Sequence, residues 1–324
     1  MAHEVAFVSE ELCRKLVTEA DAFAAVEATF AAMAAEQARN FPVVREAVAH
    51  GALYGFKGGM DEPGGLLGVK AGGYFPGNAA KGLINHQSVV ALFEPETGRL
   101  AAIVGGNYLT GVRTAAAAAV SVRHLAREDA KVLGILGAGH QSLFQLRAVA
   151  AARGFERVIA WNRDEAKLKR LADAAAALGL PFEAVERARL GAEADVIVTI
   201  VSAHEALIMA EEVKPGAHLA CMGTDTVGKQ EVDPALLARA EVFAEEPSQS
   251  VTIGEAQHAL RLGLIAAEAV TPVGAVINGA HPGRSGPEAV TLFDGSGVGL
   301  QDLAVASLAL KRAKEAGLAG AASL

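Results

Sequence analysis

The chain of 324 residues is long enough for one large or two medium domains, and 52% of its residues are hydrophobic, which is ample for a sizeable core. Its net charge of −8 and its pI near 5.6 argue against a surface that binds nucleic acid or an anionic membrane. No apolar run approaches the roughly 18 residues of a membrane span, and the first residues show no secretory signal. The two cysteines, Cys13 and Cys221, provide no disulfide framework, so we expect a cytoplasmic protein. The histidines and cysteines show no HxH, HExxH or CxxC spacing, so no metal is expected.

The first third of the chain predicts a mixed domain. A short strand is expected at residues 4–8, and an alanine-rich helix at about 19–37, where apolar residues recur at helical spacing. From about residue 43 to 105, β-type segments alternate with glycines, and residues 87–104 predict a hairpin. We therefore expect a mostly antiparallel sheet with one helix, an α+β domain.

The rest of the chain predicts an α/β domain of the Rossmann type. Residues 107–126 form an expected long helix, after which apolar strands alternate with helices, as in a parallel sheet covered on both faces. Residues 290–317 predict a strand, a glycine loop and a long helix, and residues 320–324 are expected to be frayed or disordered. We place the first domain at residues 1–117 and 299–324, and the Rossmann domain at residues 118–298.

A glycine turn between a strand and a helix is the most informative motif. Residues 131–147, KVLGILGAGHQSLFQLR, predict a buried strand, a turn through Gly137 and Gly139, and a helix that begins near Gln141. Gly137 allows a tight turn, and Gly139 lets the backbone approach a phosphate with no Cβ in the way. The third fingerprint position holds Ser142 instead of glycine, so a plain connector is the alternative to a dinucleotide site.

The end of the next strand bears on the choice between NAD and NADP. Enzymes that use NAD usually place Asp or Glu there to accept hydrogen bonds from the ribose, whereas this strand ends in Asn162 and Arg163. Without a carboxylate a 2′-phosphate is not repelled, and Arg163 could pair with it; Arg163 could also stack on adenine or face solvent. We expect NAD or NADP as the cofactor, with the preference unresolved.

Basic residues in the first domain are candidates for binding an anionic substrate. Arg45, Lys70 and Arg113 lie among apolar or small residues, in FPVVREAV, LLGVKAGG and LTGVRTAA. A cation in such surroundings either lies on an exposed strand face or points into a cleft toward an anion. Three of them, in an acidic protein with a cofactor motif, favour a carboxylate-binding pocket. Lys57 is a further possibility, and His86 could border the pocket or serve as hydrogen-bonded scaffold.

Asp225 is the candidate for acid/base chemistry. It follows the apolar strand AHLACMG in the loop GTDTVGK, and ligands of open α/β sheets collect at the carboxyl ends of parallel strands. A partly buried carboxylate there could transfer a proton, although Asp is also common as a helix or turn cap. Lys229 could pair with Asp225 or lie on the surface. His140 is expected at the edge of the cofactor, and Glu255 and His258 are expected to be structural or solvated.

Five segments together resemble the ornithine cyclodeaminase/μ-crystallin family: GVKAGGYFPGN, LTGVRTAAAAA, GILGAGHQSLFQL, GTDTVGKQEV and FDGSGVGLQDLA. The resemblance runs from about Phe41 to Ala316. Members of that family also have serine at the third position of the glycine motif, where this chain has Ser142. The resemblance implies a homodimer whose β-rich first domains pair, with a Rossmann domain inserted before a returning C-terminal helix.

The resemblance also implies a role for each candidate residue. Arg45, Lys70 and Arg113 would hold the substrate carboxylate, with Lys70 also near the reacting group, and Asp225 would be the acid/base residue. The residues that would line the cofactor are Thr114, Gly137, Gly139, His140, Gln141, Asn162, Arg163, Ser296 and Gly297, the last two near the nicotinamide.

Members of that family share hydride transfer at a carbon that bears nitrogen and neighbours a carboxylate. They include cyclodeaminases, in which a bound cofactor takes and returns a hydride within one cycle, alanine dehydrogenases, and reductases of ketimines or imino acids. Because the loop after Asp225 departs from the cyclodeaminase pattern, we expect NAD(P)H-dependent reduction of a small imino acid to an L-amino acid. Iminosuccinate, pyruvate imine and a cyclic ketimine are all possible substrates. The alternatives are an ornithine or lysine cyclodeaminase, a non-enzymatic binding protein and a generic hydroxyacid dehydrogenase.

Overall fold

The chain divides into two compact units. The computed structural model describes residues 3–323. The first unit comprises Met1–Arg113 and Val298–Leu324, and the second comprises Thr114–Gly297. The boundaries expected from the sequence, after residues 117 and 298, lie four residues and one residue further along the chain (117 against 113, 298 against 297).

The first unit contains an eight-stranded sheet in the order β18-β1-β7-β6-β5-β4-β2, with β3 paired to β4. Its strands are β1 (Glu4–Val8), β2 (Ala38–Asn40), β3 (Val44–Val48), β4 (Ala52–Asp61), β5 (Leu66–Tyr74), β6 (His86–Phe93), β7 (Leu100–Gly105) and β18 (Gly320–Ser323). Neighbouring strands run antiparallel except β1 and β7, so the prediction of a mostly antiparallel sheet is confirmed. β6 and β7 form the expected hairpin.

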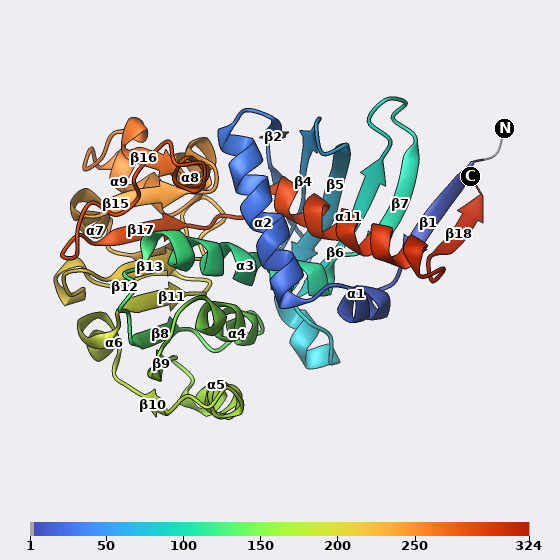
Figure 1. Cartoon of the computed structure of the whole chain (residues 1–324). Helices are drawn as coiled ribbons and strands as arrows, with labels where there is room; N and C mark the ends of the chain where they lie inside the picture. The colour runs from blue at the N-terminus through green and yellow to red at the C-terminus, as the bar shows by residue number, and fades with distance from the viewer. Residues whose placement is uncertain (1–2, 324) are drawn as a thin grey trace. The chain divides into compact units, whose positions relative to one another are not determined.

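Helices pack on this sheet. Those that lie wholly in the described part of the first unit are α1 (Glu10–Leu16), α2 (Glu19–Ala34) and α11 (Gly299–Glu315). α11 packs along β4, β5 and β6, and α2 packs on α11 (Figure 1). The prediction of one helix before residue 105 is wrong, because α1 is too short to show an apolar repeat. Its start is set by Ser9, whose side chain accepts a hydrogen bond from Leu12 N.

The C-terminal segment also differs from its prediction. The sequence predicts fraying at residues 320–324, but Gly320–Ser323 form β18, which pairs antiparallel with β1 at the edge of the sheet. Leu324 lies outside the described residues. Small residues with no apolar alternation carry no strand pattern, so this strand depends on backbone pairing with β1 that the sequence does not reveal.

The second unit contains an eight-stranded parallel sheet in the order β10-β9-β8-β11-β13-β17-β15-β16. Its strands are β8 (Val132–Leu136), β9 (Arg157–Trp161), β10 (Phe182–Ala184), β11 (Val196–Thr199), β13 (His218–Cys221), β15 (Glu241–Ala244), β16 (Val270–Pro272) and β17 (Thr291–Asp294). A separate pair, β12 (His204–Ile208) and β14 (Gln230–Val232), was not expected from the sequence.

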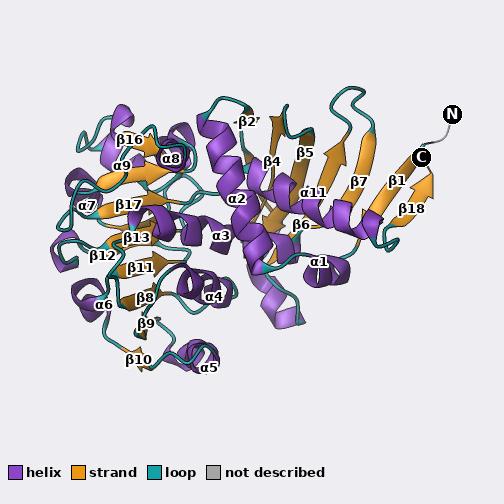
Figure 2. Cartoon of the chain, in the orientation of Figure 1, coloured by secondary structure: helices purple, strands orange, loops and turns teal. Residues whose placement is uncertain are grey.

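Helices cover both faces of the parallel sheet. In Figure 2, α6, α7 and α9 lie on one side of it, and α4 and α5 lie on the other. The helices of this unit are α4 (Ser142–Ala152), α5 (Leu168–Ala177), α6 (Arg187–Glu193), α7 (Pro234–Arg239), α8 (Pro247–Ile253), α9 (Ala256–Arg261), α10 (Val273–Ile277) and the second part of α3 (Asn107–Leu125). The predicted α/β fold class, a Rossmann-type parallel sheet accompanied by an α+β unit, is confirmed.

The apolar strands explain why the sheet is buried on both faces. Every residue of β11, β13 and β17 is buried, and strands covered on both sides need no polar alternation. Because these strands are parallel, the loops after β8, β13 and β17 all lie at the same edge of the sheet. That edge carries Gly137, Asp225 and Ser296.

Within residues 3–323 no helix is long and apolar enough to cross a membrane.

Candidate active site

Lys70 and Arg113 form a buried cation pair in the first unit. Lys70 lies on β5 and Arg113 on α3. Both are buried: Lys70 is 6% exposed and Arg113 is 5% exposed. Both bind the carboxylate of Asp302: Lys70 Nζ lies 3.1 Å from Oδ1 and 3.2 Å from Oδ2, and Arg113 Nε lies 3.0 Å from Oδ1. Lys70 Nζ also donates to Thr110 Oγ1 at 3.1 Å. Two cations therefore share one buried carboxylate.

The first turn of α11 brings the carboxylate to these cations. α11 begins at Gly299, where a Cβ would lie 2.6 Å from Gly58 N, so only glycine lets the helix start this close to β4. Two residues later Gln301 Oε1 accepts a hydrogen bond from Arg113 Nη1 at 3.0 Å, and Asp302 follows. Neither Gln301 nor Asp302 was predicted from the sequence as a site residue. The available signal was an acidic residue in the first turn of a helix that is otherwise largely buried.

Burial and neighbouring charges set the protonation of this cluster. Burial lowers the pKa of Lys70 to about 8, with further lowering by Arg113 and Arg45, although the charge of Asp302 opposes the shift. Burial would raise the pKa of Asp302, but Arg113, Lys70 and Lys57 outweigh it and hold that pKa below its ordinary value. With Asp302 ionised, Lys70 and Arg113 leave a net charge of +1 (two positive, one negative). A substrate carboxylate would balance that charge.

Arg45 and Lys57 lie on the same face of the sheet as Lys70. Lys57 is directly opposite Lys70 in the β4–β5 register, and Arg45 on β3 is opposite Gly55 on β4. Side chains alternate along a strand, so positions 55 and 57 of β4 share one face. The candidate cations of the first unit are thus brought together on the side of the sheet that α11 covers.

His86 joins this cluster through hydroxyl groups. It begins β6, and its Nε2 lies 3.2 Å from Ser88 Oγ. Ser88 Oγ lies 3.4 Å from Thr110 Oγ1, which accepts a hydrogen bond from Lys70. A chain of polar contacts therefore links His86 to Lys70.

The glycine turn of the second unit has the shape that a pyrophosphate needs. Gly137 has a φ of 112°, which favours glycine, and a Cβ there would lie 2.7 Å from Val201 Cγ1. A Cβ on Gly139 would meet nothing within 4 Å, so the space beside this backbone position is open and a phosphate could approach it. Ser142 Oγ donates to Gly139 O at 2.7 Å and closes the turn at the start of α4. This arrangement fits a phosphate at a helix N-terminus.

The residues around the turn divide into supporting and outward-facing ones. Asn162 supports it: Oδ1 accepts from Ala138 N at 3.0 Å, and Nδ2 donates to Asp164 O at 2.7 Å. Arg163 and His140 are exposed. Gln141 Oε1 is buried and has no hydrogen-bond partner among the described residues, so a donor on a ligand could satisfy it.

Asp225 lies in the loop between β13 and β14, at the carboxyl edge of the parallel sheet. Its Oδ1 accepts from Lys229 Nζ at 2.8 Å and from Thr226 Oγ1 at 3.2 Å. Of the two environments expected for Lys229, the structure has the ion pair. The Asp225 side chain is 28% exposed, so the carboxylate can still exchange a proton with a ligand at this edge.

Ser296 and Gly297 follow β17, the strand next to β13. Gln249 Nε2 donates to Ser296 Oγ at 2.8 Å and to Gly297 O at 3.0 Å, and Gly297 N donates to Glu245 Oε2 at 2.7 Å. The buried side chains of Gln249 and Glu245 therefore hold this loop in place. Thr114, the first residue of the second unit, is buried on α3.

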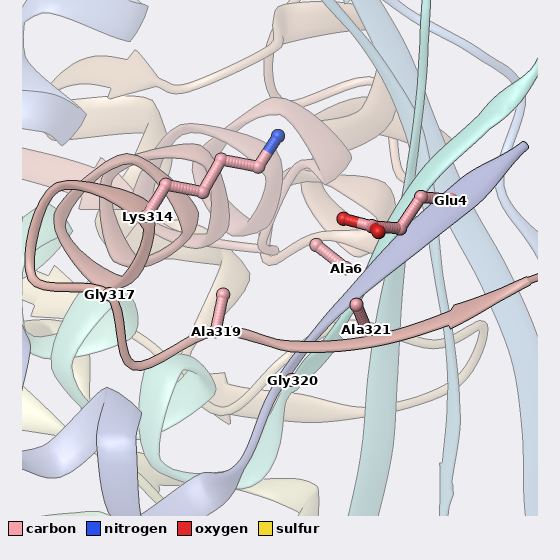
Figure 3. Close-up of a pocket in the computed structure, with 7 residues that line it drawn as sticks. All are labelled: Glu4, Ala6, Lys314, Gly317, Ala319, Gly320 and Ala321. Carbon is pink, nitrogen blue, oxygen red and sulfur yellow. The ribbon is translucent and has the colours of Figure 1, made fainter.

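The pocket in Figure 3 lies elsewhere in the first unit. It has a volume of about 200 Å³ beside β1, β18 and the end of α11, and the Glu4 carboxylate and the Lys314 ammonium both point toward it. Strands β7 and β6 separate β1 from β5, which carries Lys70, so this pocket is not part of the cation cluster.

Within residues 3–323 no group of three or more His, Cys, Asp or Glu side chains could hold a metal ion.

Comparison with known proteins shows what the chain is similar to. The model of the ornithine cyclodeaminase/mu-crystallin family matches residues 4–317. The chain is 59% identical to the iminosuccinate reductase of Paracoccus denitrificans over 313 residues, which cover 96% of this chain and 98% of that protein.

Solved structures also match over nearly the whole chain. The crystal structure of the iminosuccinate reductase of Paracoccus denitrificans in complex with NAD⁺ has a TM-score of 0.94 and 57% identity, and covers 99% of this chain and 100% of that one. An archaeal alanine dehydrogenase dimer with bound NAD has a TM-score of 0.94 and 29% identity, and covers 99% of each chain. The resemblance seen in the sequence is confirmed, and the chain belongs to the ornithine cyclodeaminase/μ-crystallin family.

Proposed function

We propose that this chain is an NAD(P)H-dependent imine reductase that converts iminosuccinate to L-aspartate. The observation that carries the proposal is the buried cluster of Lys70, Arg113 and Asp302, whose net charge of +1 calls for an anionic ligand. Among the imino acids that satisfy this requirement, iminosuccinate is favoured by the 59% identity to an iminosuccinate reductase over nearly the whole chain.

In this proposal the first unit binds the substrate carboxylates. Arg113, Lys70 and Arg45 bind the carboxylate next to the imine carbon, and Asp302 holds Lys70 and Arg113 in place before the substrate arrives. Such preorganisation lowers the entropy cost of aligning the reacting carbon. Lys57, opposite Lys70, and His86, linked to it through Ser88 and Thr110, bind the second carboxylate.

Reduction of the imine carbon needs a hydride and a proton. Bound NADH or NADPH supplies the hydride. Asp225 supplies or relays the proton to the substrate nitrogen, and Lys229 keeps its carboxylate in place through the 2.8 Å ion pair. The turn at Gly137 and Gly139 holds the pyrophosphate. The other proposed cofactor-lining residues are Thr114, His140, Gln141, Asn162, Arg163, Ser296 and Gly297.

A screen of NADH and NADPH oxidation tests this proposal. Oxaloacetate, pyruvate and other 2-oxo acids are each supplied with ammonia, alongside preformed cyclic ketimines. We expect oxaloacetate with ammonia to give the highest kcat/KM. Arg113→Ala should mainly raise KM for the imino acid, and a change confined to cofactor affinity would remove Arg113 from the substrate site. Ammonia release from ornithine or lysine with no net change in NADH would instead identify a cyclodeaminase.

We also propose that the chain forms a homodimer through its first unit. The sheet face opposite the cations exposes apolar side chains: Val44 and Phe56 are each 45% exposed, and Val89 is 37% exposed. Val44 is opposite Phe56, Phe56 is opposite Ala71, and Ala71 is opposite Val89, so these residues form one row across β3, β4, β5 and β6. An apolar row on an open sheet fits a second copy of the chain. Phe56→Glu should yield monomers in analytical ultracentrifugation, and an unchanged mass for this variant and wild type would refute this interface.

A cytoplasmic location is also proposed. Cys13 and Cys221 are both buried free thiols, which suits a reducing compartment. Fractionation of cells that make the protein tests this; recovery outside the cytoplasm would contradict it.

A further inference from the structure

The loop that carries Asp225 is bounded by buried acidic side chains. It runs from Met222 to Lys229, between β13 and β14. Glu231 on β14 and Glu255 before α9 are 0% and 1% exposed. A buried carboxylate needs several hydrogen-bond donors to offset its lost hydration, so the donors it uses show what it holds in place.

Glu231 fastens both ends of this loop to the neighbouring strand. Its Oε2 accepts from Gly223 N, at the start of the loop, and from Thr199 Oγ1 on β11, each at 2.8 Å. Its Oε1 accepts from Val201 N, just after β11, at 2.8 Å. Because Glu231 itself follows the loop, one side chain closes the loop on itself and ties it to the end of β11. A Cβ on Gly223 would overlap Glu231 Oε1 and Val201 O, so the closure leaves no room for a side chain there.

Glu255 supports Glu231 from the other side. Its Oε1 accepts from Glu231 N and Val232 N, each at 2.8 Å, and its Oε2 accepts from Thr224 Oγ1 at 2.5 Å. The Glu255 backbone is itself held by Asp294 Oδ2, which accepts from Glu255 N at 2.7 Å. These contacts fix the strand from which the Glu231 side chain projects.

We propose that Glu231 is a positioning residue for Asp225: by tying Gly223 to the end of β11, its carboxylate fixes the loop from which Asp225 reaches the substrate. This inference rests on the proposed acid/base role of Asp225. Glu231 contacts neither Asp225 nor the proposed substrate-binding residues through any hydrogen bond described for it, so it acts through the backbone.

The donor pattern predicts opposite outcomes for glutamine at the two acidic positions. At Glu231 one carboxylate oxygen accepts from Val201 N and the other accepts from Gly223 N, and a backbone N–H can only donate. The side-chain amide of glutamine has only one oxygen, so one of these two N–H groups would face the NH₂ group. At Glu255 both backbone N–H groups reach the same oxygen, and the other oxygen meets a hydroxyl that can accept as well as donate. Glutamine can therefore keep all three contacts at position 255, with the Thr224 hydroxyl accepting in place of donating, whereas at position 231 it must lose one contact to a backbone N–H.

The test compares Glu231→Gln with Glu255→Gln, both as full-length proteins. Hydrogen–deuterium exchange is followed in peptides covering residues 222–230 and, as a reference, residues of β8. Steady-state kinetics with oxaloacetate, ammonia and NADH, and the Kd of NADH, are measured on the same samples. For Glu231→Gln we expect faster exchange only in the loop, a kcat lowered about ten- to a hundred-fold, and a Kd of NADH within about two-fold of wild type. Glu255→Gln should change each quantity less than about two-fold.

Three results would overturn the inference. They are unchanged loop exchange in Glu231→Gln, a wild-type kcat despite faster exchange, and faster exchange that extends to β8, which would mean that Glu231 stabilises the whole unit. The function proposed above fails separately, if the wild-type protein reduces no imine or if Asp225→Asn retains the wild-type rate. In that event the exchange data still decide whether Glu231 holds the loop.

Discussion

Replacing Asp302 by asparagine should move the pH dependence of catalysis, because Asp302 keeps Lys70 protonated. Its carboxylate lies 3.1 Å from Lys70 Nζ, whereas burial, Arg113 and Arg45 all favour the neutral amine. An opposite charge at this range shifts a pKa by about 1–3 units. Starting from a pKa of about 8, Lys70 in Asp302→Asn should therefore titrate about 1–3 units lower.

The sign of the effect follows from which form of Lys70 binds the carboxylate. In the proposed function the ammonium form binds the substrate, so activity should be present below the pKa and lost as pH rises through it. At about pH 7.5 a pKa of about 8 leaves about three quarters of Lys70 protonated, and a pKa of about 7 leaves about one quarter. We expect kcat/KM of the wild type to fall above about pH 8, and that of Asp302→Asn to fall at least about one unit earlier.

The measurement is the ratio of kcat/KM for Asp302→Asn to that for wild type, across the pH range with the same substrate. The ratio cancels the pH dependence of imine formation from the oxo acid and ammonia. Asp302→Glu, which keeps the charge, serves as the matched variant, and its kcat/KM should fall at nearly the same pH as that of the wild type. A ratio that stays constant with pH would refute the reasoning, because Asp302 would then act only through packing.

Three further predictions concern other parts of the molecule. Asp225→Asn should lower kcat by about 10²–10⁴-fold with the Kd of NADH nearly unchanged, and a near wild-type rate would remove Asp225 from the mechanism. Gly139→Ala should keep the wild-type Tm but weaken NADH binding on the order of ten-fold, about 1.4 kcal/mol, because its Cβ enters open space that we assign to the phosphate. Gly137→Ala, at a φ of 112°, should instead lower the Tm as well, and equal effects of the two alanines on Tm would contradict this reading of the turn. Arg312 donates to Asp21 at 2.5 Å and 2.7 Å and depresses the pKa of Asp21, so Asp21→Asn should cost about 1 kcal/mol of unfolding free energy at neutral pH. That difference should shrink as pH falls below about 4, because the Asp21 carboxyl then takes up a proton in the unfolded state while its depressed pKa still keeps it ionised in the folded state. A difference independent of pH would argue against the ion pair.

Local patterns in the sequence were sufficient for much of the fold. The apolar strand before Gly137, the hairpin at residues 87–104 and the alternation of strands and helices each depend on neighbours a few residues apart, so they could be predicted. The short helix α1 and the strand β18 could not, because neither has a periodic apolar pattern. β18 forms only because the other end of the chain supplies β1 as a partner.

The candidate site was predictable as a set of residue types but not as a network. Lys70 and Arg113 were unusual as cations among small and apolar residues, and that signal was local. Their partner Asp302 lies 232 residues after Lys70, so the pairing depends on how α11 packs on the sheet. The positioning role proposed for Glu231 could not be predicted for a similar reason. In the sequence Glu231 is an ordinary acidic residue, and only the fold brings three hydrogen-bond donors to its carboxylate.

The central claim, net reduction of a dicarboxylic imine, is tested most directly by the product balance of one reaction. The purified protein is given oxaloacetate, ammonia and NADH, and the L-aspartate formed is quantified against the NADH consumed. We predict one L-aspartate for each NADH oxidised, with a lower kcat/KM for the same reaction of pyruvate. Formation of no amino acid, or ammonia release from ornithine or lysine with no net NADH consumption, would contradict the claim.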